Sequence, residues 1–414
     1  MDQYFKLSEK GTSIQTEILA GLITFFSSSY ILFVHPVMLS EAGVPQVLSL
    51  LATIFIAIVA SLTMGLYANT PLVMAPGLGM TAYFAYTLVG GLGFTWQESL
   101  GITIVSSLIF VLLTFTGVIE SFRLSIPLEL KKAITIGIGF FLVRIGLENA
   151  GFLLEDGFNW SWLGFIGLLI VLVLTLFKVK GAFLIAIALI TAIFWIFTDG
   201  LEVSSTNALL ELGNYFDLLD IQFSNMISIN GLIAIFSFVM LLIFQALGIV
   251  EAFVEDREEA KKSYQVVSVM SVLSGVFGTS PAITLSENGA GIQEGGRTGL
   301  STSVAGLLFL VALFVTPLFS YIPAVAAGPV IVFTGLSMGK LITSIEVPHW
   351  SLWLPAIVII LSIPLSGSIV SGMAYGFVLY PIIAFIFGQK GRLNPTNLTI
   401  SFLFLLLLVV EIFL

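Results

Sequence analysis

The 414-residue sequence contains no cysteine and only two histidines, His35 and His349. The lack of cysteine excludes disulfide bonds and thiolate metal sites, and two isolated imidazoles argue against a metalloenzyme. Charged residues make up only 9% of the chain, whereas soluble domains have about a quarter. The formal charge of −9 has the wrong sign for a general nucleic-acid binder. We therefore expect a membrane protein without a cofactor and without a nucleic-acid partner.

The residues that are present are hydrophobic at 58% of positions, and they form apolar runs of bilayer length along the whole chain. We predict an all-α polytopic membrane protein with fourteen spans, seven on either side of a polar stretch near 199–225. A last apolar run, 398–414, is either a further span or an interfacial segment. The predicted spans are 17–39, 47–68, 71–89, 100–119, 131–149, 162–178, 181–198, 230–252, 264–278, 281–293, 300–319, 323–341, 352–365 and 367–388.

Basic residues predict the orientation of these spans, because they collect on the cytoplasmic side of membrane proteins. If the N-terminus is cytoplasmic, every lysine and arginine except Arg144, which lies within a span, falls on that side. The cytoplasmic set is Lys6, Lys10, Arg123, Lys131, Lys132, Lys178, Lys180, Arg257, Lys261, Lys262, Arg297, Lys340, Lys390 and Arg392. The predicted outer loops carry acids: Glu41, Glu98, Glu155, Asp156, Asp199, Glu202, Glu211, Asp217 and Asp220. The pattern indicates a multi-pass protein of the cell membrane with a cytoplasmic N-terminus.

The two sets of spans suggest an internal repeat, and an odd number per set requires the second half to be inverted. The third spans match best. Residues 69–79 (NTPLVMAPGLG) and 279–289 (TSPAITLSENG) each start with a hydroxyl residue and proline. Each predicts a short extended strand followed by a glycine-rich helix start. Ordinary kinks in packed helices are the alternative, but broken spans at matching positions are the best sequence pointer to a transporter site.

Polar and small residues around these broken spans are the candidate substrate contacts: Ala75, Gly77, Thr81, Gln245, Ser286, Glu287 and Asn288. An acidic side chain at the centre of a membrane costs roughly 2.5–3.5 kcal/mol on insertion scales, so Glu287 calls for an explanation. Its carboxyl group can accept N–H groups of a ligand. A carboxyl that gains and loses a proton is also what a proton-coupled carrier needs, so Glu287 is the candidate coupling residue.

Structural interpretations of these residues stay open. Glu287 can hydrogen bond to nearby amides, Gln245 can join two helices, and Thr81 can bond its own helix backbone. His35 is expected at the outer end of the first span, where an interfacial histidine is unremarkable. Residues 294–299 (EGGRTG) look like a phosphate loop, but they lack the Walker spacing and follow no strand. We interpret them as a tight cytoplasmic turn.

Three segments carry a resemblance to a known family: APGLGMTAYF at 75–84, ENGAGI at 287–292 and EGGRTGL at 294–300. The chain resembles the AzgA-like purine permeases, which carry hypoxanthine, guanine or adenine. They are a branch of the nucleobase–cation symporter superfamily that includes xanthine and uracil permeases. The resemblance implies a uracil-permease-like inverted repeat of seven plus seven spans. It also implies proton-driven uptake, often by a homodimer, of a purine held between the strands of spans three and ten, with Glu287 binding the base.

The resemblance further implies a core domain, residues 1–119 and 230–319, and a gate domain, residues 120–229 and 320–414. Three positions depart from the family pattern. The family usually has asparagine where this chain has Thr81, an acid at Gln245, and asparagine at His35. The loss of the span-eight carboxylate leaves proton coupling to Glu287 alone or weakens it, so the identity of the base stays open.

Two other functions fit less well. An anion carrier of the sulfate-permease kind on the same fold would be expected to present a positive site, and Glu287 has the opposite charge. An intramembrane enzyme would need a nucleophile–base pair or a metal set at membrane depth, and the sequence offers neither. We therefore expect a secondary-active nucleobase importer and not an enzyme.

Overall fold

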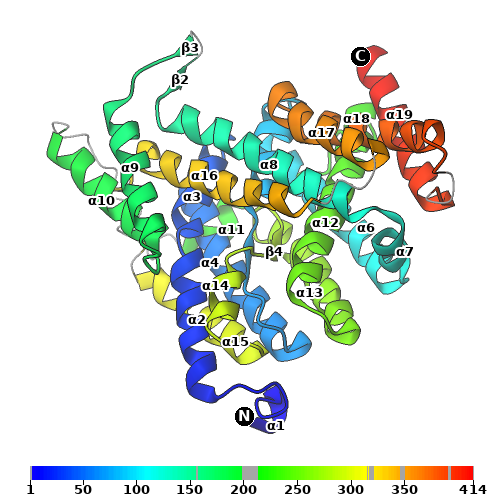
Figure 1. Ribbon diagram of the computed structural model, residues 1–414. Coiled ribbons are helices and arrows are strands. Elements are labelled where there is room, and N and C mark those ends of the chain that lie inside the picture. Colours follow the sequence, from blue (N-terminus) through cyan, green and yellow to red (C-terminus); the bar gives the residue numbers. More distant parts are fainter. Residues whose placement is uncertain are drawn as a thin grey trace.

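Helices make up most of the computed structural model in Figure 1, which describes residues 2–154, 157–197, 213–314, 316, 321–345, 350–389 and 393–413. Six helical segments in these ranges are long and apolar enough to cross a membrane: Ile14–Glu41, Gln46–Ala68, Trp96–Phe115, Ile229–Phe253, Ala324–Thr343 and Ile369–Ile386. Shorter apolar helices accompany them at Leu78–Val89, Trp162–Leu176, Ala182–Phe197, Gly299–Ala312, Trp350–Ser366 and Pro395–Val410. The predicted helical, multi-pass class is confirmed, while the count of fourteen spans and the cytoplasmic N-terminus stay predictions.

The first half of the chain forms most of its predicted spans as helices and breaks the third with a strand. Its elements are α1 (Asp2–Phe5), α2 (Ile14–Ser28), α3 (Ile31–Glu41), α4 (Gln46–Thr63), η1 (Met64–Ala68), β1 (Met74–Pro76), α5 (Leu78–Ala82), η2 (Tyr83–Val89), α6 (Trp96–Phe115), α7 (Val118–Ser125), α8 (Leu128–Asn149), β2 (Leu153–Leu154), β3 (Gly157–Phe158), α9 (Trp162–Leu176) and α10 (Ala182–Phe197).

The second half repeats this order of helix, broken span and helix. Its elements are α11 (Tyr215–Leu218), α12 (Ile229–Phe253), α13 (Arg257–Val276), β4 (Ala282–Thr284), α14 (Asn288–Gln293), α15 (Gly299–Ala312), α16 (Ala324–Gly339), η5 (Lys340–Ser344), α17 (Trp350–Ser366), α18 (Ile369–Ile386) and α19 (Pro395–Phe413). The last apolar run is therefore helical through most of its length.

Short polar signals fix where several helices begin. The side chains of Ser161, Ser228 and Ser368 each accept a backbone N–H in the first turn of α9, α12 and α18. Thr95 and Glu98 form a reciprocal capping box at the start of α6. These caps satisfy N–H groups that would otherwise lack partners at the helix ends.

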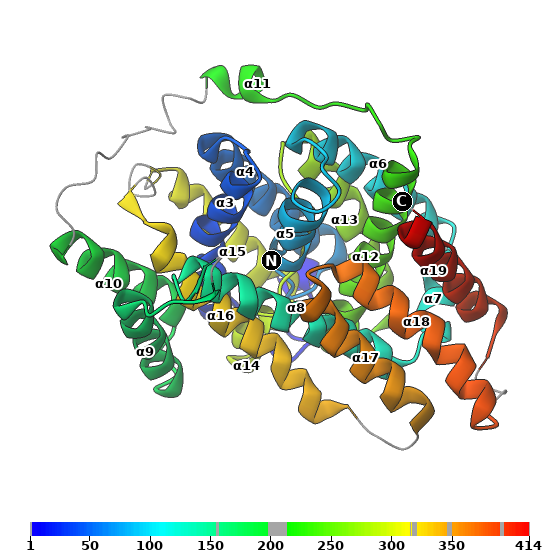
Figure 2. The same ribbon diagram turned by 90° about the horizontal axis from the view of Figure 1, so that it is seen from above.

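Helix packing divides the elements into two groups. In the first group, α15 packs on α2 and α4, α13 packs on α6, and α12 packs on α6 and α13. In the second group, α8 packs most extensively on α16 and α17, while α9, α10 and α18 extend this layer. Figure 2 shows the second group along the lower and left side of the molecule, with α3, α4, α5, α6, α12 and α13 above it in this view.

Glycines allow the central helices of the second group to approach closely. A side chain at Gly335 of α16 would collide with the backbone oxygen of Gly139 in α8, and one at Gly328 would meet that of Gly146. Small residues at such crossings let membrane helices pack backbone to backbone. The α8–α16 pair therefore forms a tight scaffold opposite the broken spans.

Three local features differ from the sequence-based expectation. The first predicted span is interrupted at Ser29–Tyr30, between α2 and α3. The amphipathic helix α7 and the β2–β3 hairpin were not predicted. Several residues used for the predicted orientation, or named as candidates, lie outside the described ranges: Glu155, Asp156, Asp199, Glu202, Glu211, His349, Lys390 and Arg392.

Candidate functional site

The two broken spans meet as an antiparallel pair of strands, β1 and β4. Met74 lies opposite Thr284, Ala75 opposite Ile283, and Pro76 opposite Ala282. Beyond the strands, Gly77 N donates to Pro281 O at 3.2 Å and Leu285 N donates to Val73 O at 3.2 Å. The predicted short strands in spans three and ten are therefore present, and the two α-helices that follow them, α5 and α14, begin beside each other's strand. Irregular backbone of this kind inside a membrane must be satisfied by protein contacts.

Asn288 holds the two strands together. Its Oδ1 accepts from Val73 N at 2.8 Å, and its Nδ2 donates to Val73 O at 3.1 Å and to Leu285 O at 2.7 Å. The side chain is completely buried. All polar atoms of this amide are therefore engaged with backbone, which is the arrangement of a positioning residue.

Glu287 is the residue that precedes α14, and its carboxylate is only partly buried. Tyr30 Oη donates to Glu287 Oε1 at 2.5 Å, and Ser286 Oγ donates to Oε2 at 3.1 Å. Ser286 itself is exposed. Glu287 also lines a cavity of about 460 Å³ that is bounded by α2, the α9–α10 turn and α14. A hydrogen-bonding carboxylate is thus open to a small molecule.

Gln245 of α12 packs against the start of α5. A side chain at Gly79 would collide with Gln245 Nε2, and one at Gly77 would lie 3.6 Å from Gln245 Oε1. The residue is 7% exposed, and its Nε2 has no hydrogen-bond partner among the described residues. Buried donors are normally paired, so this amide is a candidate ligand contact, and the lack of a side chain at Gly79 leaves it the room it occupies.

Thr81 belongs to a buried polar cluster centred on His35. His35 Nδ1 lies 2.7 Å from Thr81 Oγ1, and His35 Nε2 lies 2.7 Å from Thr279 Oγ1. Thr81 Oγ1 also donates to Gly77 O at 2.9 Å and lies 3.1 Å from Ser280 Oγ. A neutral imidazole has one donor and one acceptor nitrogen, so it can bridge two hydroxyls. His35 therefore ties the helix after β1 to the segment before β4.

This position corrects the expectation that His35 is an unremarkable interfacial residue. The side chain is completely buried and bridges the two broken spans. Sequence reasoning also missed Tyr30, which contacts the candidate carboxylate. The one signal for Tyr30 is the serine run before it: Ser28 Oγ donates to Thr24 O at 2.8 Å and Ser29 Oγ to Phe26 O at 3.2 Å. Such side-chain bonds compete with regular helix.

The candidate residues thus fall into three places around the strand pair. Ala75 is the buried centre of β1, while Ser286, Glu287 and Asn288 follow β4. Gln245 and Gly77 meet at the start of α5. Thr81 lies one turn further on and contacts His35 rather than the cavity at Glu287.

The turn at 294–299 binds a carboxylate of the chain itself. Glu17 is completely buried. It accepts from Arg297 N at 2.7 Å, Thr298 N at 3.4 Å and Ser301 N at 3.1 Å. Gly295 has a φ of +99°, which glycine adopts without strain. The segment is a tight turn, as predicted, and Glu17 fills the place that a phosphate would take.

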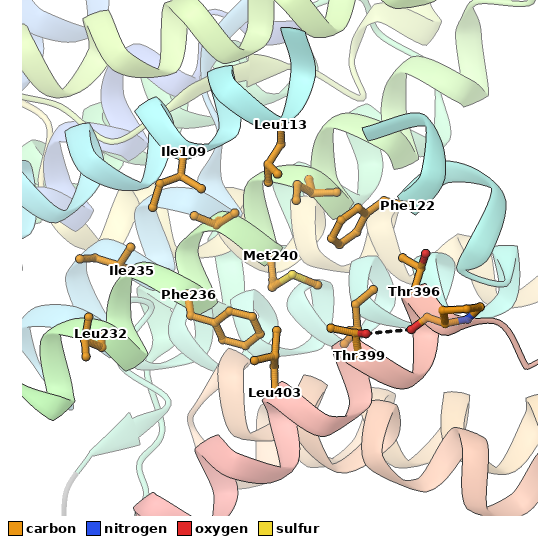
Figure 3. Close-up of a pocket in the computed structure, with 14 residues that line it drawn as sticks. Ile109, Leu113, Phe122, Leu232, Ile235, Phe236, Met240, Thr396, Thr399 and Leu403 are labelled. Atoms are coloured by element: carbon orange, nitrogen blue, oxygen red, sulfur yellow. Dashed lines mark hydrogen bonds between the residues drawn. The ribbon is translucent and has the colours of Figure 1, made fainter. Parts of the chain in front are cut away.

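A large apolar groove elsewhere is not a good site for a polar ligand. Figure 3 shows this groove between α6, α7, α12 and α19, with Ile109, Leu113, Phe122, Phe236 and Leu403 among the side chains around it. Of its two polar side chains, Thr399 donates to the carbonyl of Pro395 in its own helix. Few polar groups converge here, whereas ligand sites place several to orient the ligand.

A helical membrane protein in which two broken spans meet through short strands has the architecture of a secondary transporter. The chain belongs to the Permease family: the family model Xan_ur_permease matches residues 15–373. It is accordingly a permease and not an enzyme. No group of three or more histidine, aspartate or glutamate side chains in the described ranges is placed to hold a metal ion.

Similar curated proteins cover nearly the whole chain. Nucleobase transporter PlAzg2 of Paenibacillus larvae is 34% identical over 88% of this chain and 76% of that protein. Guanine/hypoxanthine permease PbuO of Bacillus subtilis is 34% identical over 98% of this chain and 100% of that protein. Adenine permease AdeP of Escherichia coli is 30% identical over 99% of this chain and 96% of that protein.

Similar solved structures share the fold at low identity. The transmembrane domain of the cyanobacterial bicarbonate transporter BicA superposes with a TM-score of 0.65 at 16% identity, over 87% of this chain and 97% of that chain. SLC26A9 superposes with a TM-score of 0.62 at 13% identity, over 90% of this chain and 65% of that chain. These similarities show a shared fold and do not identify a substrate.

Proposed function

We propose that this permease imports a nucleobase, with a purine as the expected substrate, across the cytoplasmic membrane in symport with protons. The relatives that cover the chain are named for nucleobase, guanine/hypoxanthine and adenine transport. The observation that carries the proposal is the Glu287 carboxylate at the end of the β1–β4 pair, facing a 460 Å³ cavity. Nucleobases present ring N–H groups that such a carboxylate accepts.

The proposed contacts follow from the free hydrogen-bonding capacity of each residue. Glu287 accepts ring or amino N–H groups, and Gln245 Nε2, which lacks a partner, donates to a ring nitrogen or carbonyl oxygen. Ser286 has an exposed hydroxyl beside Glu287, and the base is proposed to reach the backbone of Ala75 and Gly77 from there. Asn288 and Thr81 act through position, because the first clamps the strands and the second is bonded to His35. This differs from the direct contacts expected for both from the sequence.

Proton coupling is assigned to Glu287 alone. Its carboxylate oxygens have hydroxyl partners, Tyr30 and Ser286, and no ion-pair partner among the described residues. A proton can therefore be taken up there without breaking a salt bridge. An inward-moving charge gains about 2.3 kcal/mol per 100 mV, which is enough to drive accumulation.

The two packing groups support alternating access by a core and a gate. We propose that the core comprises residues 1–119 and 230–319 and carries the strand pair, and that the gate comprises residues 120–229 and 320–414 with α8 and α16 as its scaffold. We also propose fourteen spans in two inverted halves, a cytoplasmic N-terminus and a homodimer. The positions of Lys178 and Lys180 in the turn between α9 and α10 fit a cytoplasmic end of the Glu287 cavity.

Uptake into proteoliposomes tests the function. We expect labelled hypoxanthine, guanine or adenine to accumulate when the lumen is alkaline, and accumulation to be lost in Glu287→Ala. Glu148→Ala, which removes a partly exposed carboxylate paired with Arg144, is the matched control. No uptake of any base, or uptake indifferent to Glu287→Ala, would overturn the proposal.

A second candidate is an anion carrier, because BicA and SLC26A9 share the fold. The carboxylate of Glu287 opposes an anionic substrate unless it is protonated. Adding bicarbonate or sulfate to the same vesicles separates the two. Anion uptake that competes with no base would favour this alternative.

A further inference from the structure

Tyr30 hydrogen bonds to the carboxylate of Glu287, which the proposed function assigns to the substrate. It lies in the break between α2 and α3, and its side chain is 1% exposed. The bond from its hydroxyl to Glu287 Oε1 is short, at 2.5 Å, as is typical of a hydroxyl that donates to a charged oxygen. The break in the helix places this ring opposite the residue that precedes α14.

The other contacts of Tyr30 come from the second packing group. Its ring meets that of Phe183, in α10, edge to face with centroids 5.1 Å apart. Thr334 Oγ1, in α16, lies 3.4 Å from Tyr30 Oη and donates to Val330 O of its own helix at 2.9 Å. The Tyr30 side chain thus touches the strand-bearing group at Glu287 and the opposing group at Phe183 and Thr334.

The turn that leads to Phe183 also contacts the α14 end of the cavity. Residues 178–183 of this turn line the cavity together with Glu287 and Glu294. Lys180 Nζ lies 2.9 Å from Glu294 Oε1, with side chains 55% and 37% exposed. Exposed ion pairs contribute little stability, so this contact can break and re-form easily. The contact between Phe183 and Tyr30, by contrast, involves the buried Tyr30 ring.

We propose that Tyr30 is a positioning residue that holds Glu287 when no substrate is bound and releases it when a base binds. The inference rests on the proposed function. A base N–H that takes the place of the Tyr30 hydroxyl at Oε1 leaves that hydroxyl without its acceptor. A buried hydroxyl without an acceptor is costly, so the ring must then move, which changes its contacts with Phe183 and Thr334.

This mechanism couples occupancy of the site to the contact between the two packing groups. A ligand shifts a conformational equilibrium only through its different affinity for the two states. Here the difference is the Tyr30–Glu287 bond, which competes with the base in one state and is absent in the other. A simple brace at a helix break would stabilise one structure and would not compete with the ligand.

Tyr30→Phe separates these possibilities, because it keeps the ring contact with Phe183 and removes only the hydroxyl. We expect the Kd for a labelled purine to fall about tenfold or more, the factor of one hydrogen bond to a charged group, while the maximal uptake rate falls by a similar factor. Tyr86→Phe is the matched control, because Tyr86 Oη donates to Glu41 Oε2 at 2.7 Å away from the cavity. That control should change neither quantity.

Thr334→Val gives a second, milder test that preserves Tyr30 itself. It removes the polar contact that α16 makes with Tyr30 Oη, so the maximal uptake rate should fall while binding of the base is kept. If the wild-type protein takes up base and both Tyr30→Phe and Thr334→Val match it in Kd and in maximal uptake rate, the role of Tyr30 is overturned and the proposed function is left intact. Weaker binding in Tyr30→Phe would indicate a brace and would also overturn it. A wild-type protein that binds no base would overturn the proposed function as well.

Discussion

His35 and Thr81, two of the positions at which this chain departs from the AzgA-like pattern, contact each other, with Nδ1 and Oγ1 2.7 Å apart. The resemblance places asparagine at both positions. Two of the departures from the pattern therefore lie at one contact, between the first span and the helix after β1.

This contact predicts a coupled pair in a double-mutant cycle. His35→Asn alone leaves Thr279 or Thr81 without its partner, and Thr81→Asn alone crowds the imidazole, so each should reduce base uptake at least tenfold. The double variant should recover most of it, with a coupling of about 1 kcal/mol or more for contacting residues. Initial uptake rates of the four proteins measure the coupling. Additive losses would contradict a functional contact between the two residues.

Asn288 is predicted to act on stability rather than on ligand binding alone. Asn288→Ala leaves the buried Val73 N without an acceptor and removes one of two donors from Val73 O and from Leu285 O. Each unsatisfied buried group costs about 1–3 kcal/mol, so the melting temperature in detergent should fall by several degrees with or without base. Asn159→Ala, which removes one exposed bond to Gly151, should leave it unchanged. A normal melting temperature with lost binding would instead assign Asn288 to the ligand.

Glu17 gives a prediction at the first turn of α15. Glu17→Ala removes the acceptor of three backbone N–H groups, and hydrogen bonds to a charged group contribute about 1.5–3 kcal/mol each. We expect a lower melting temperature and faster proteolysis within 294–301, because this turn loses what orders it. The control is Glu9→Ala, since Glu9 is exposed and lies 3.9 Å from Lys6. Unchanged proteolysis in Glu17→Ala would contradict the structural role.

These cases mark what the sequence could and could not predict. The strands of the broken spans were predictable because Pro71, Pro76 and Pro281 and the nearby glycines act locally on the backbone. The pairing of Glu287 with Tyr30 and that of His35 with Thr279 were not, because these partners lie 257 and 244 residues away along the chain. A buried histidine and a histidine near a membrane surface look alike in a hydropathy pattern. Pairings of this kind depend on how the two halves pack, which no local signal specifies.

Asn288 shows that local chemistry also does not distinguish a ligand contact from a structural contact. An amide next to a carboxylate in a broken span predicts a ligand contact on chemistry alone. In the folded protein its three hydrogen bonds go to Val73 and Leu285, because the strand pair leaves backbone groups that need partners at that place. The meeting of the two broken spans was therefore predictable, whereas the hydrogen-bond partners of their polar side chains were not.

Acid pH should weaken the α7 region, outside the proposed spans. The hydrogen bond from Arg123 is the largest effect on Glu120 and holds the pKa of its carboxyl below the ordinary 4.5. A lowered pKa in the folded state means that the stabilisation is fully present above 4.5 and is lost as the pH falls through the lower folded value. Melting temperatures from pH 7 down to pH 3 should therefore drop less in Glu120→Gln than in wild type. Parallel curves for the two proteins would contradict the linkage.

Gln245→Glu tests whether the missing acid of span eight sets the coupling. Gln245 packs against Gly77 and Gly79, so glutamate fits the same space and adds a second carboxyl group beside the strand pair. If Glu287 alone carries one proton per base, 100 mV supports roughly 50-fold accumulation by charge movement. A second proton would square that ratio.

We therefore expect the accumulation ratio at a fixed potential to rise more steeply in Gln245→Glu than in wild type, with slower turnover because the added group must also be neutralised in the membrane. Gln265→Glu is the matched control, because Gln265 accepts from Tyr67 and lies outside the site. Accumulation ratios measured with labelled base at several imposed potentials decide the matter. If the accumulation ratio of Gln245→Glu depends on the imposed potential as in wild type, the carboxyl group at position 245 carries no proton through the cycle. The coupling then depends on Glu287 and its hydroxyl partners.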